Sequence, residues 1–324
     1  MLLLTLACPV DGQNSGDTSH ATDVAASSKS PKLHLPGDYA AVNGVRLWYE
    51  SEGSGPPLVL IAGGPGFSHS YFHPHFSVLA TSFRVIYYDA FGTGKSDRAH
   101  DRHEYAFARD VENLEGLRKA LGLEKINVLG HSYGGMVAQA YALRYPESVQ
   151  KVILVDSSWG AEMSRALIDN SNYEIRNQYP ESFEKRMKMH ERGLLSCSEE
   201  YQKADDADET FLLFYNMSAS EKLGQSVEPL NADVFCAING DDPDFVEGGE
   251  MAKLDFRPQL KDLRMPMLIM AGRFDRILFP RYQVKFKSYA PQAQFVMFEK
   301  SGHFPFIEEP ENFTRIVKEF LQKK

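Results

Sequence analysis

Short runs of consecutive apolar residues alternate along most of the chain with segments whose apolar residues recur at helical spacing. Apolar runs bounded by turn-forming residues are typical of strands buried on both faces of a sheet. They predict strands at residues 58–62, 84–89, 126–130, 151–156, 267–272 and 294–298. The intervening segments predict helices at residues 104–121, 136–145, 281–289 and 311–322. This alternation predicts an α/β fold, with a mostly parallel sheet flanked by helices.

A hairpin is predicted at the start of this pattern. Residues 39–42 and 46–50 flank Asn43-Gly44, which is the favoured pair for a type I′ turn. We therefore expect the ordered part of the chain to begin near Gly37.

The alternation stops between residues 157 and 263, a segment that we call the cap. Amphipathic helices are predicted there at residues 162–177, 181–195 and 209–217. A helical segment inserted between two sheet strands is expected to roof a site at the edge of the sheet. Residues 37–156 and 264–324 are then expected to form one core.

The first 36 residues are predicted to stay outside this core. Residues 1–8 resemble the end of a secretory apolar region that runs into a lipoprotein cleavage box at Cys8. Residues 9–32 are rich in Ser, Thr, Asp, Gly and Ala, and we interpret 1–36 as a signal remnant and tether. We expect an exported protein, periplasmic or lipoprotein-like, whose sole membrane contact is a lipid anchor at Cys8. The alternative is a cytoplasmic protein with an unstructured N-terminus.

Charge and cysteine content exclude some further classes of protein. The 324-residue chain has a formal net charge of −9, which argues against nucleic acid as a partner. The cap alone holds 22 acidic and 11 basic residues, a balance of −11. Three cysteines, an odd number without metal-ligand spacing, suggest no disulfide framework. Cys197 and Cys236 are expected to be small packing residues.

The most informative stretch is Gly130-His-Ser132-Tyr-Gly134-Gly. It lies between a predicted strand and a predicted helix, the setting in which G-x-S-x-G forms a nucleophile elbow. The flanking glycines are explained by the close approach of the neighbouring strand and helix. We predict that Ser132 is a catalytic nucleophile; the alternative is a serine in a buried turn.

An acid and a histidine follow Ser132 in the order that such a site requires. Asp275 comes directly after the strand predicted at 267–272, and His303 follows the last predicted strand. A serine hydroxyl needs an imidazole to take its proton, and a carboxylate must hold that imidazole in one tautomer. The alternatives are a turn-forming or helix-capping Asp275 and a His303 that is an ordinary loop residue.

The loop Gly63-Gly64-Pro65-Gly66 follows the strand predicted at 58–62. Backbone N–H groups form an oxyanion hole, and glycines allow a substrate oxygen to approach them closely. We predict that the N–H groups of Gly64 and Tyr133 are the donors. A plain Gly/Pro turn is the alternative.

Two other sequence patterns resemble a phosphate-binding loop and a metal site but lack a residue that each requires. Residues 89–96 end in Gly94-Lys-Ser96 like a phosphate-binding loop, but Asp89 stands where that motif requires glycine, so we interpret them as a structural turn. The nearby histidines lack a clear further ligand, so no metal site is expected. These histidines, at positions 69, 73 and 75, are interpreted as surface or site-lining, and His131 as a packing residue.

Together these motifs resemble the α/β-hydrolase superfamily and, within it, the proline iminopeptidase family. The resemblance extends over residues 39–321 and includes the cap stretch 234–245. It implies an α/β-hydrolase fold and removal of one amino acid, often proline, from a free peptide N-terminus. It also implies that cap carboxylates bind the terminal ammonium, which assigns this role to Asp244 and, on a looser match, to Glu221. The chain departs from the family at Ala62, usually His, and at Ala90-Phe91, usually Gln-Arg.

The sequence therefore predicts a serine hydrolase that acts by acyl transfer and needs no cofactor or metal. An aminopeptidase acting on small molecules or short peptides is favoured. A carboxylesterase or lactonase for small neutral esters is the alternative. A binding protein that has lost catalysis is the remaining class, and the intact set of Ser132, Asp275 and His303 argues against it.

Overall fold

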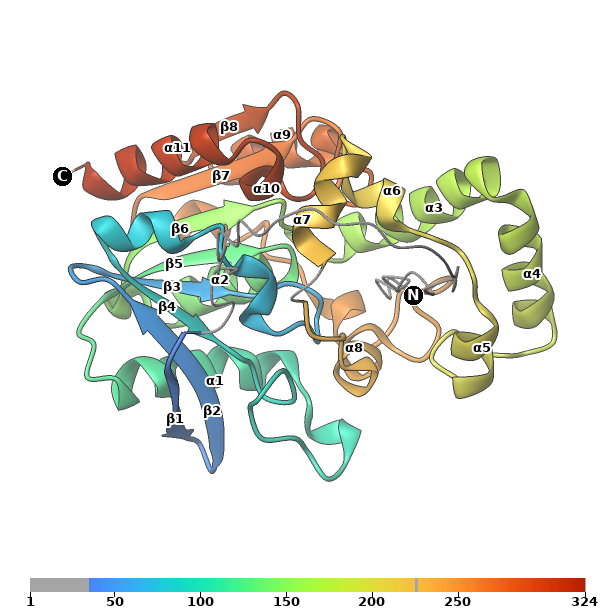
Figure 1. Cartoon of the computed structure of the whole chain (residues 1–324), viewed down its shortest axis with the longest axis horizontal. Coiled ribbons are helices and arrows are strands. Elements are labelled where there is room, and N and C mark those ends of the chain that lie inside the picture. The colour runs from blue at the N-terminus through green and yellow to red at the C-terminus, as the bar shows by residue number, and fades with distance from the viewer. Residues whose placement is uncertain (1–34, 225–226, 324) are drawn as a thin grey trace, which may run out of the picture.

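The computed structural model describes residues 35–224 and 227–323. Its centre is a sheet in the order β1-β2-β4-β3-β5-β6-β7-β8. The strands are Gly37–Val42, Val45–Glu52, Pro57–Ile61, Arg84–Tyr88, Ile126–His131, Val149–Val155, Met267–Gly272 and Gln294–Phe298, from β1 to β8. Pairing is antiparallel from β1 through β2 to β4 and parallel across the rest. The predicted α/β fold with a mostly parallel sheet is confirmed (Figure 1).

The core helices flank this sheet. They are α1 (Phe107–Ala120), α2 (Tyr133–Arg144), α9 (Pro280–Tyr289), α10 (Pro305–Glu308) and α11 (Pro310–Gln322). The helix predicted at 104–121 begins later because Ala106 is extended, and a 3-10 turn, Arg102–Glu104, precedes it. Every residue of β5 and β7 is buried, as expected for strands covered on both faces.

The predicted hairpin is present. Asn43 and Gly44 have φ angles of 48° and 85°, and they join β1 to β2 with Val42 paired to Val45. A type I′ turn needs a positive φ at both central residues, which Asn and Gly tolerate best. The turn residues thus fix the register of this edge of the sheet.

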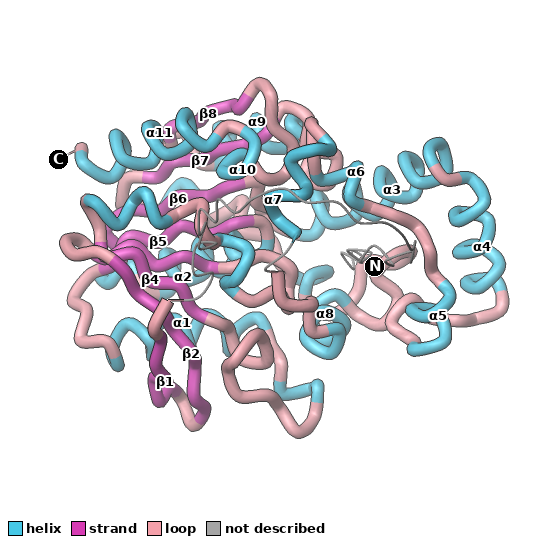
Figure 2. The backbone as a smooth tube through the Cα atoms, in the orientation of Figure 1, coloured by secondary structure: helices cyan, strands magenta, loops and turns pink. Residues whose placement is uncertain are grey.

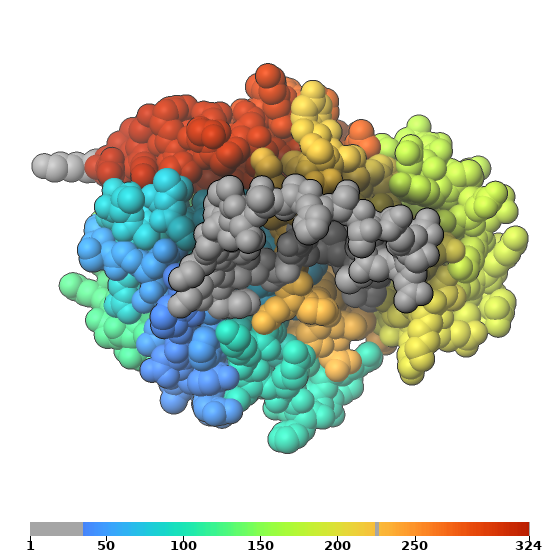
Figure 3. Space-filling model, in the orientation of Figure 1, coloured from blue at the N-terminus to red at the C-terminus, as the bar shows by residue number. Residues whose placement is uncertain are grey.

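The described residues of the cap form six α-helices, which lie between β6 and β7 in the chain. They are α3 (Ala161–Gln178), α4 (Pro180–Glu191), α5 (Glu199–Ala204), α6 (Thr210–Leu213), α7 (Glu221–Gly224) and α8 (Ala232–Asn239). Figures 1 and 2 show α3, α4 and α5 beside the sheet rather than on it, and in Figure 3 the same yellow-green segment occupies one end of the molecule. None of the described helices is both long and apolar enough to cross a bilayer.

The helix predicted at 209–217 is much shorter than expected. It ends at Leu213, whose carbonyl accepts a hydrogen bond from the His303 N–H at 2.6 Å. Phe214 is then extended, and its ring stacks on Phe304 at 5.1 Å between centroids. Tertiary contacts with the segment after β8 therefore override the local helical pattern.

Candidate active site

Ser132 lies at a sharp turn between β5 and α2. Its backbone adopts φ 54° and ψ −122°, a conformation that a non-glycine residue seldom takes. The turn is held because the Ser132 N–H donates to Val155 O at 2.9 Å and the Gly135 N–H donates to Ser132 O at 2.9 Å. A Cβ on Gly134 would lie 2.1 Å from Ile61 O. The glycine is therefore required by the close approach of α2 to β3.

His303 and Asp275 form a buried pair. The two side chains meet at 2.8 Å, between Nδ1 of His303 and Oδ2 of Asp275. Asp275 is oriented by the N–H groups of Ile277 and Leu278, which donate to Oδ1 at 2.7 and 2.9 Å. Since an ionised carboxylate only accepts, Nδ1 carries the proton of a neutral His303 ring, and Nε2 is left as the basic atom.

Four of the predicted site residues line one cavity of about 140 Å³: Ser132, His303, Gly64 and Tyr133. Asp275 lies behind His303 and is 1% exposed. Gly64 has a φ of 113°, and a Cβ there would lie 2.7 Å from Gly66 N. The structure thus gathers the nucleophile candidate, the histidine and both predicted oxyanion donors at one place.

The cap supplies most of the other cavity walls, and they are largely apolar. Cap residues that line it include Leu167, Ile168, Leu213, Leu223, Val227, Leu230, Phe235, Val246 and Met251. Such walls exclude water and strengthen electrostatic interactions inside the cavity. The cavity therefore fits a small substrate that is apolar over much of its surface.

Glu247 is the one acidic side chain among the described residues that line the cavity. Both of its carboxylate oxygens are shielded from solvent and accept no hydrogen bond from the described residues. Burial raises its pKa, and the exposed Arg165, whose Nη1 lies 3.2 Å from Oε2, opposes that shift. A buried carboxylate with unused acceptor capacity favours a cationic hydrogen-bond donor beside it.

The two carboxylates expected from the family resemblance lie elsewhere. Glu221 is exposed on α7, and neither it nor Asp244 lines the cavity. Asp244 is buried, and its backbone ties two cap segments together: its N–H donates to Ser196 Oγ at 3.2 Å, and its carbonyl accepts from Asn172 Nδ2 at 2.7 Å. Glu247 is the cavity carboxylate that the sequence analysis missed, three residues beyond Asp244.

The expectation for two of the cysteines is wrong. Cys197, between α4 and α5, forms a disulfide with Cys236 on α8. Their sequence separation of 39, together with an odd cysteine count, gave no signal for this pairing. They meet because the segment before α5 folds back along the end of α8, where the Cys197 N–H donates to Asp241 O at 3.0 Å.

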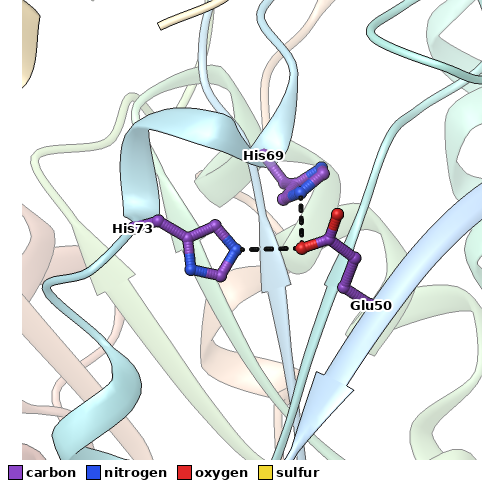
Figure 4. Close-up of side chains that lie close together, drawn as sticks. All are labelled: Glu50, His69 and His73. Atoms are coloured by element: carbon purple, nitrogen blue, oxygen red, sulfur yellow. Dashed lines mark ion pairs between the residues drawn. The ribbon is translucent and has the colours of Figure 1, made fainter. Parts of the chain in front are cut away.

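The expectation for His69 and His73 is also wrong, since both are buried and neither lines the cavity. Their Nε2 atoms lie 3.4 and 3.3 Å from Oε2 of Glu50 (Figure 4). Nδ1 of His69 lies 2.6 Å from Oδ1 of Asp89. Burial alone would lower the pKa of His69, but its hydrogen bonds to Asp89 and Glu50 raise it to about 9.

The cluster of Glu50, His69 and His73 brings ligand atoms within 4.8 Å of one another, as a metal site would. However, Glu50 already accepts hydrogen bonds from the Leu35 N–H and the Trp48 indole N–H, both at 3.1 Å. Lys95 Nζ also lies 3.7 Å from the same carboxylate. With these donors and a protonated His69, the cluster fits an internal ionic network better than a cation site.

A second such group consists of Asp156, Asp275 and His303. Burial and the neighbouring charge of Asp275 hold the pKa of Asp156 well above its usual range. Asp156 lies directly after β6 and accepts from the Gly272 N–H at 2.8 Å. The carboxylate of Asp156 is thus held by the backbone of Gly272, and Asp275 is held by His303 and two backbone N–H groups, an arrangement that fits the histidine pair better than a cation site.

The turn after β4 behaves as the structural turn that was expected. Oδ2 of Asp89 accepts from the Lys95 N–H at 2.9 Å, and Ser96 Oγ donates to Asp89 O at 2.7 Å. A Cβ on Gly94 would lie 2.2 Å from the Asp89 carboxylate. The acceptors of Asp89 therefore occupy the loop interior where a phosphate would have to bind.

A family model of the alpha/beta hydrolase fold matches residues 56–192 and 247–310. The chain belongs to the α/β-hydrolase family. It is 32% identical to a proline iminopeptidase of Heyndrickxia coagulans, over 84% of this chain and 93% of that protein. It is 28% identical to a proline iminopeptidase of Saccharolobus solfataricus, over 91% and 95%.

Solved structures agree on the fold. A proline iminopeptidase from Mycobacterium smegmatis superposes with a TM-score of 0.70 at 22% identity, covering 88% of this chain and 97% of the other. A thermophilic esterase from Thermogutta terrifontis superposes with a TM-score of 0.61 at 24% identity, covering 89% and 98%. Because peptidases and esterases share this fold, the substrate has to be argued from the site.

Proposed function

We propose that this α/β hydrolase is a serine aminopeptidase that releases an N-terminal residue from small peptides or amides. In this proposal Ser132 attacks the scissile carbonyl while Nε2 of His303 takes its proton. Nε2 then gives that proton to the leaving amine, and a water molecule activated by His303 releases the acyl group. The short contact between His303 and Asp275 supports this assignment, because it fixes the tautomer with a basic Nε2.

The charge that develops on the carbonyl oxygen needs donors that are already in place. The N–H groups of Gly64 and Tyr133 are assigned this role. The support is that both residues line the cavity with Ser132. Tyr133 is also the first residue of α2, so its N–H lies at the positive end of a helix.

Glu247 is the observation that carries the aminopeptidase assignment. A substrate with a free N-terminus brings an ammonium group close to the scissile bond, whereas a neutral ester does not. A buried carboxylate in a mostly apolar cavity pairs with such a cation far more strongly than it would in water. Relatives named proline iminopeptidase support the same substrate class. The competing assignment, a carboxylesterase or lactonase, gives Glu247 no partner in the substrate.

The mechanism is tested at Ser132. Ser132→Ala should lower turnover of every substrate by several orders of magnitude. A fluorophosphonate probe should label Ser132 in the wild type and no other serine. Near-normal turnover by the variant, or labelling at another serine, would show that the acyl-transfer mechanism is wrong.

The substrate class is tested at Glu247. The wild type should hydrolyse proline p-nitroanilide far better than its N-acetylated form. Glu247→Gln should lower kcat/KM for the free amine by roughly 30- to 1,000-fold, the cost of removing a buried charged partner, and leave p-nitrophenyl acetate turnover nearly unchanged. Glu184→Gln, on an exposed face of α4, is the matched control for charge.

Asp244→Asn completes this set of variants. If Asp244→Asn lowers kcat/KM for the free amine only, and Glu247→Gln does not lower it, the ammonium group binds at Asp244, as the family resemblance implies. Equal turnover of the free, acetylated and ester substrates by the wild type would favour the esterase assignment.

A further inference from the structure

Two buried side chains outside the proposed catalytic set connect its separate parts. The Gly63 N–H donates to Tyr71 Oη at 2.7 Å, and Tyr71 Oη lies 3.0 Å from Nδ1 of His131. Nε2 of His131 lies 2.9 Å from the backbone oxygen of His303. Tyr71, His131 and His303 are each less than 5% exposed. The result is one continuous chain of hydrogen bonds along the wall of the cavity, which Tyr71, His131 and His303 all line.

The two ends of this chain determine where every proton lies. The Gly63 N–H can only donate, so the Tyr71 oxygen accepts there and its single proton points to Nδ1 of His131. The His303 carbonyl can only accept, so Nε2 of His131 carries the ring proton. Burial and then the neighbouring His303 hold the pKa of His131 well below its usual range, which agrees with a neutral ring.

This chain of hydrogen bonds joins three segments that are far apart in the sequence. Gly63 immediately precedes Gly64, one of the proposed oxyanion donors. His131 immediately precedes Ser132, and a Cβ on Gly63 would lie 3.0 Å from Ser132 Cβ. The third contact is to the backbone of His303 itself. Each hydrogen bond therefore constrains a different member of the proposed site.

Tyr71 is itself firmly placed. It lies in the 3-10 turn His69–Phe72, which is anchored because the His69 N–H donates to Asp89 at 3.0 Å. Its ring packs against Phe304 and Phe306, with centroids 6.2 and 6.3 Å away. The ionic network drawn in Figure 4 thus holds the turn from which the Tyr71 hydroxyl reaches the site.

We propose that Tyr71 and His131 form a positioning relay that holds the oxyanion loop, the nucleophile turn and the backbone of His303 in register. The relay rests on the proposed function, because it positions groups to which that function assigns roles. Neither side chain takes part in proton transfer with the substrate. Displacement of reacting groups by about 1 Å can cost on the order of 100-fold in rate, so a relay of this kind acts mainly on kcat.

The test begins with Tyr71→Phe, which removes one oxygen atom and keeps the ring. We expect kcat to fall about 10- to 100-fold for both proline p-nitroanilide and p-nitrophenyl acetate, with KM changed less than about threefold. Tyr141→Phe is the matched control, because Tyr141 is buried on α2 outside the cavity and its hydroxyl donates to Glu115 at 2.8 Å. That variant should lose similar stability and keep its kcat.

His131→Phe tests the other half of the relay. Its effect on kcat should match that of Tyr71→Phe, and the double variant should be no more than about threefold slower than the slower single variant. Two-bond proton–nitrogen spectra of the wild type at pH 7 should show a neutral His131 that is protonated at Nε2. If His131→Phe does not fold, Tyr71→Phe and these spectra still decide.

Four outcomes would overturn the relay. They are a kcat of Tyr71→Phe within about threefold of the wild type, multiplicative losses in the double variant, an equal kcat loss in Tyr141→Phe, and a His131 ring that carries a proton on Nδ1. Failure of the proposed function looks different. In that case the fluorophosphonate probe would miss Ser132 in the wild type, whereas a disrupted relay still leaves Ser132 labelled, only more slowly.

Discussion

Reduction of the disulfide between Cys197 and Cys236 should destabilise the cap by a predictable amount. The bond closes a loop across a sequence separation of 39 residues. In the chain-entropy treatment, opening a loop of this length removes about 4 kcal/mol of stability at 25 °C. For a chain of 324 residues the entropy of unfolding is about 0.7 kcal/mol/K, so 1 kcal/mol corresponds to about 1.5 °C in Tm and reduction should lower Tm by roughly 6 °C.

The structure also indicates how reduction should affect activity. Cys236 is on α8, the helix that supplies Phe235 and Asn239 to the cavity wall. Hydrogen bonds from Ser196 N and Oγ to Asp242, both at 3.0 Å, still hold the two segments together after reduction. At low temperature we therefore expect an intact cavity and a modest rise in KM. Near the lowered Tm, activity should be lost before the core unfolds.

The assay combines thiol counting with thermal unfolding. Reduction of the denatured protein should expose two further thiols, those of Cys197 and Cys236. The double variant Cys197→Ser and Cys236→Ser should reproduce the lower Tm without reductant. Alkylation of Cys197 and Cys236 without reductant would show that the bond does not form. A Tm shift below about 2 °C would show that loop closure contributes little here.

Three other predictions concern the core. Because the pKa of His69 is raised to about 9 from about 6.5 in the unfolded chain, its stabilisation is complete below pH 6.5 and lost as the pH rises through 9. The free energy of unfolding should then fall by roughly 3 kcal/mol more between pH 6.5 and 9.5 in the wild type than in His69→Gln. An equal pH dependence of stability in the two proteins would show that His69 is not charged in the folded state. Asp275→Asn should lower kcat on the order of 10⁴-fold without loss of fold, as measured by steady-state kinetics and circular dichroism. Gly134→Ala forces a Cβ against the carbonyl of Ile61 and should destabilise the protein by about 3 kcal/mol or more in urea unfolding; wild-type stability would contradict the close packing of α2 on β3.

The core could be predicted from the sequence because its signals are local. Apolar runs specify buried strands, and Asn43-Gly44 specifies the hairpin turn that begins the sheet. In the cap, amphipathic patterns in the sequence predict helices α3 and α4. The length of α6 could not be predicted in this way, because its end is set by a hydrogen bond to His303, about 90 residues later.

The same distinction between local signals and long-range contacts explains which site residues could be predicted from the sequence. Ser132, Asp275 and His303 could be predicted because each sits in a recognisable turn after a strand and the chain order is diagnostic. Glu247 lies in an irregular segment of the cap, where no periodicity indicates which carboxylate faces the cavity. The pairing of Glu50 with His69 and His73 depends on strand β2 lying beside β4, which apolar runs alone do not reveal. Reaction class was therefore more predictable than substrate.

The disulfide also bears on where the protein works. Cytosolic thiols are kept reduced, and disulfides persist mainly in exported proteins. The expected signal and anchor at Cys8 lie outside the described residues, so the bond between Cys197 and Cys236 is separate support for the export that we propose. A cytoplasmic enzyme would keep both thiols reduced and would forgo the stability that loop closure provides. Thiol alkylation in intact cells separates the two cases: an exported protein should yield Cys197 and Cys236 unmodified, and a cytoplasmic one should yield both alkylated.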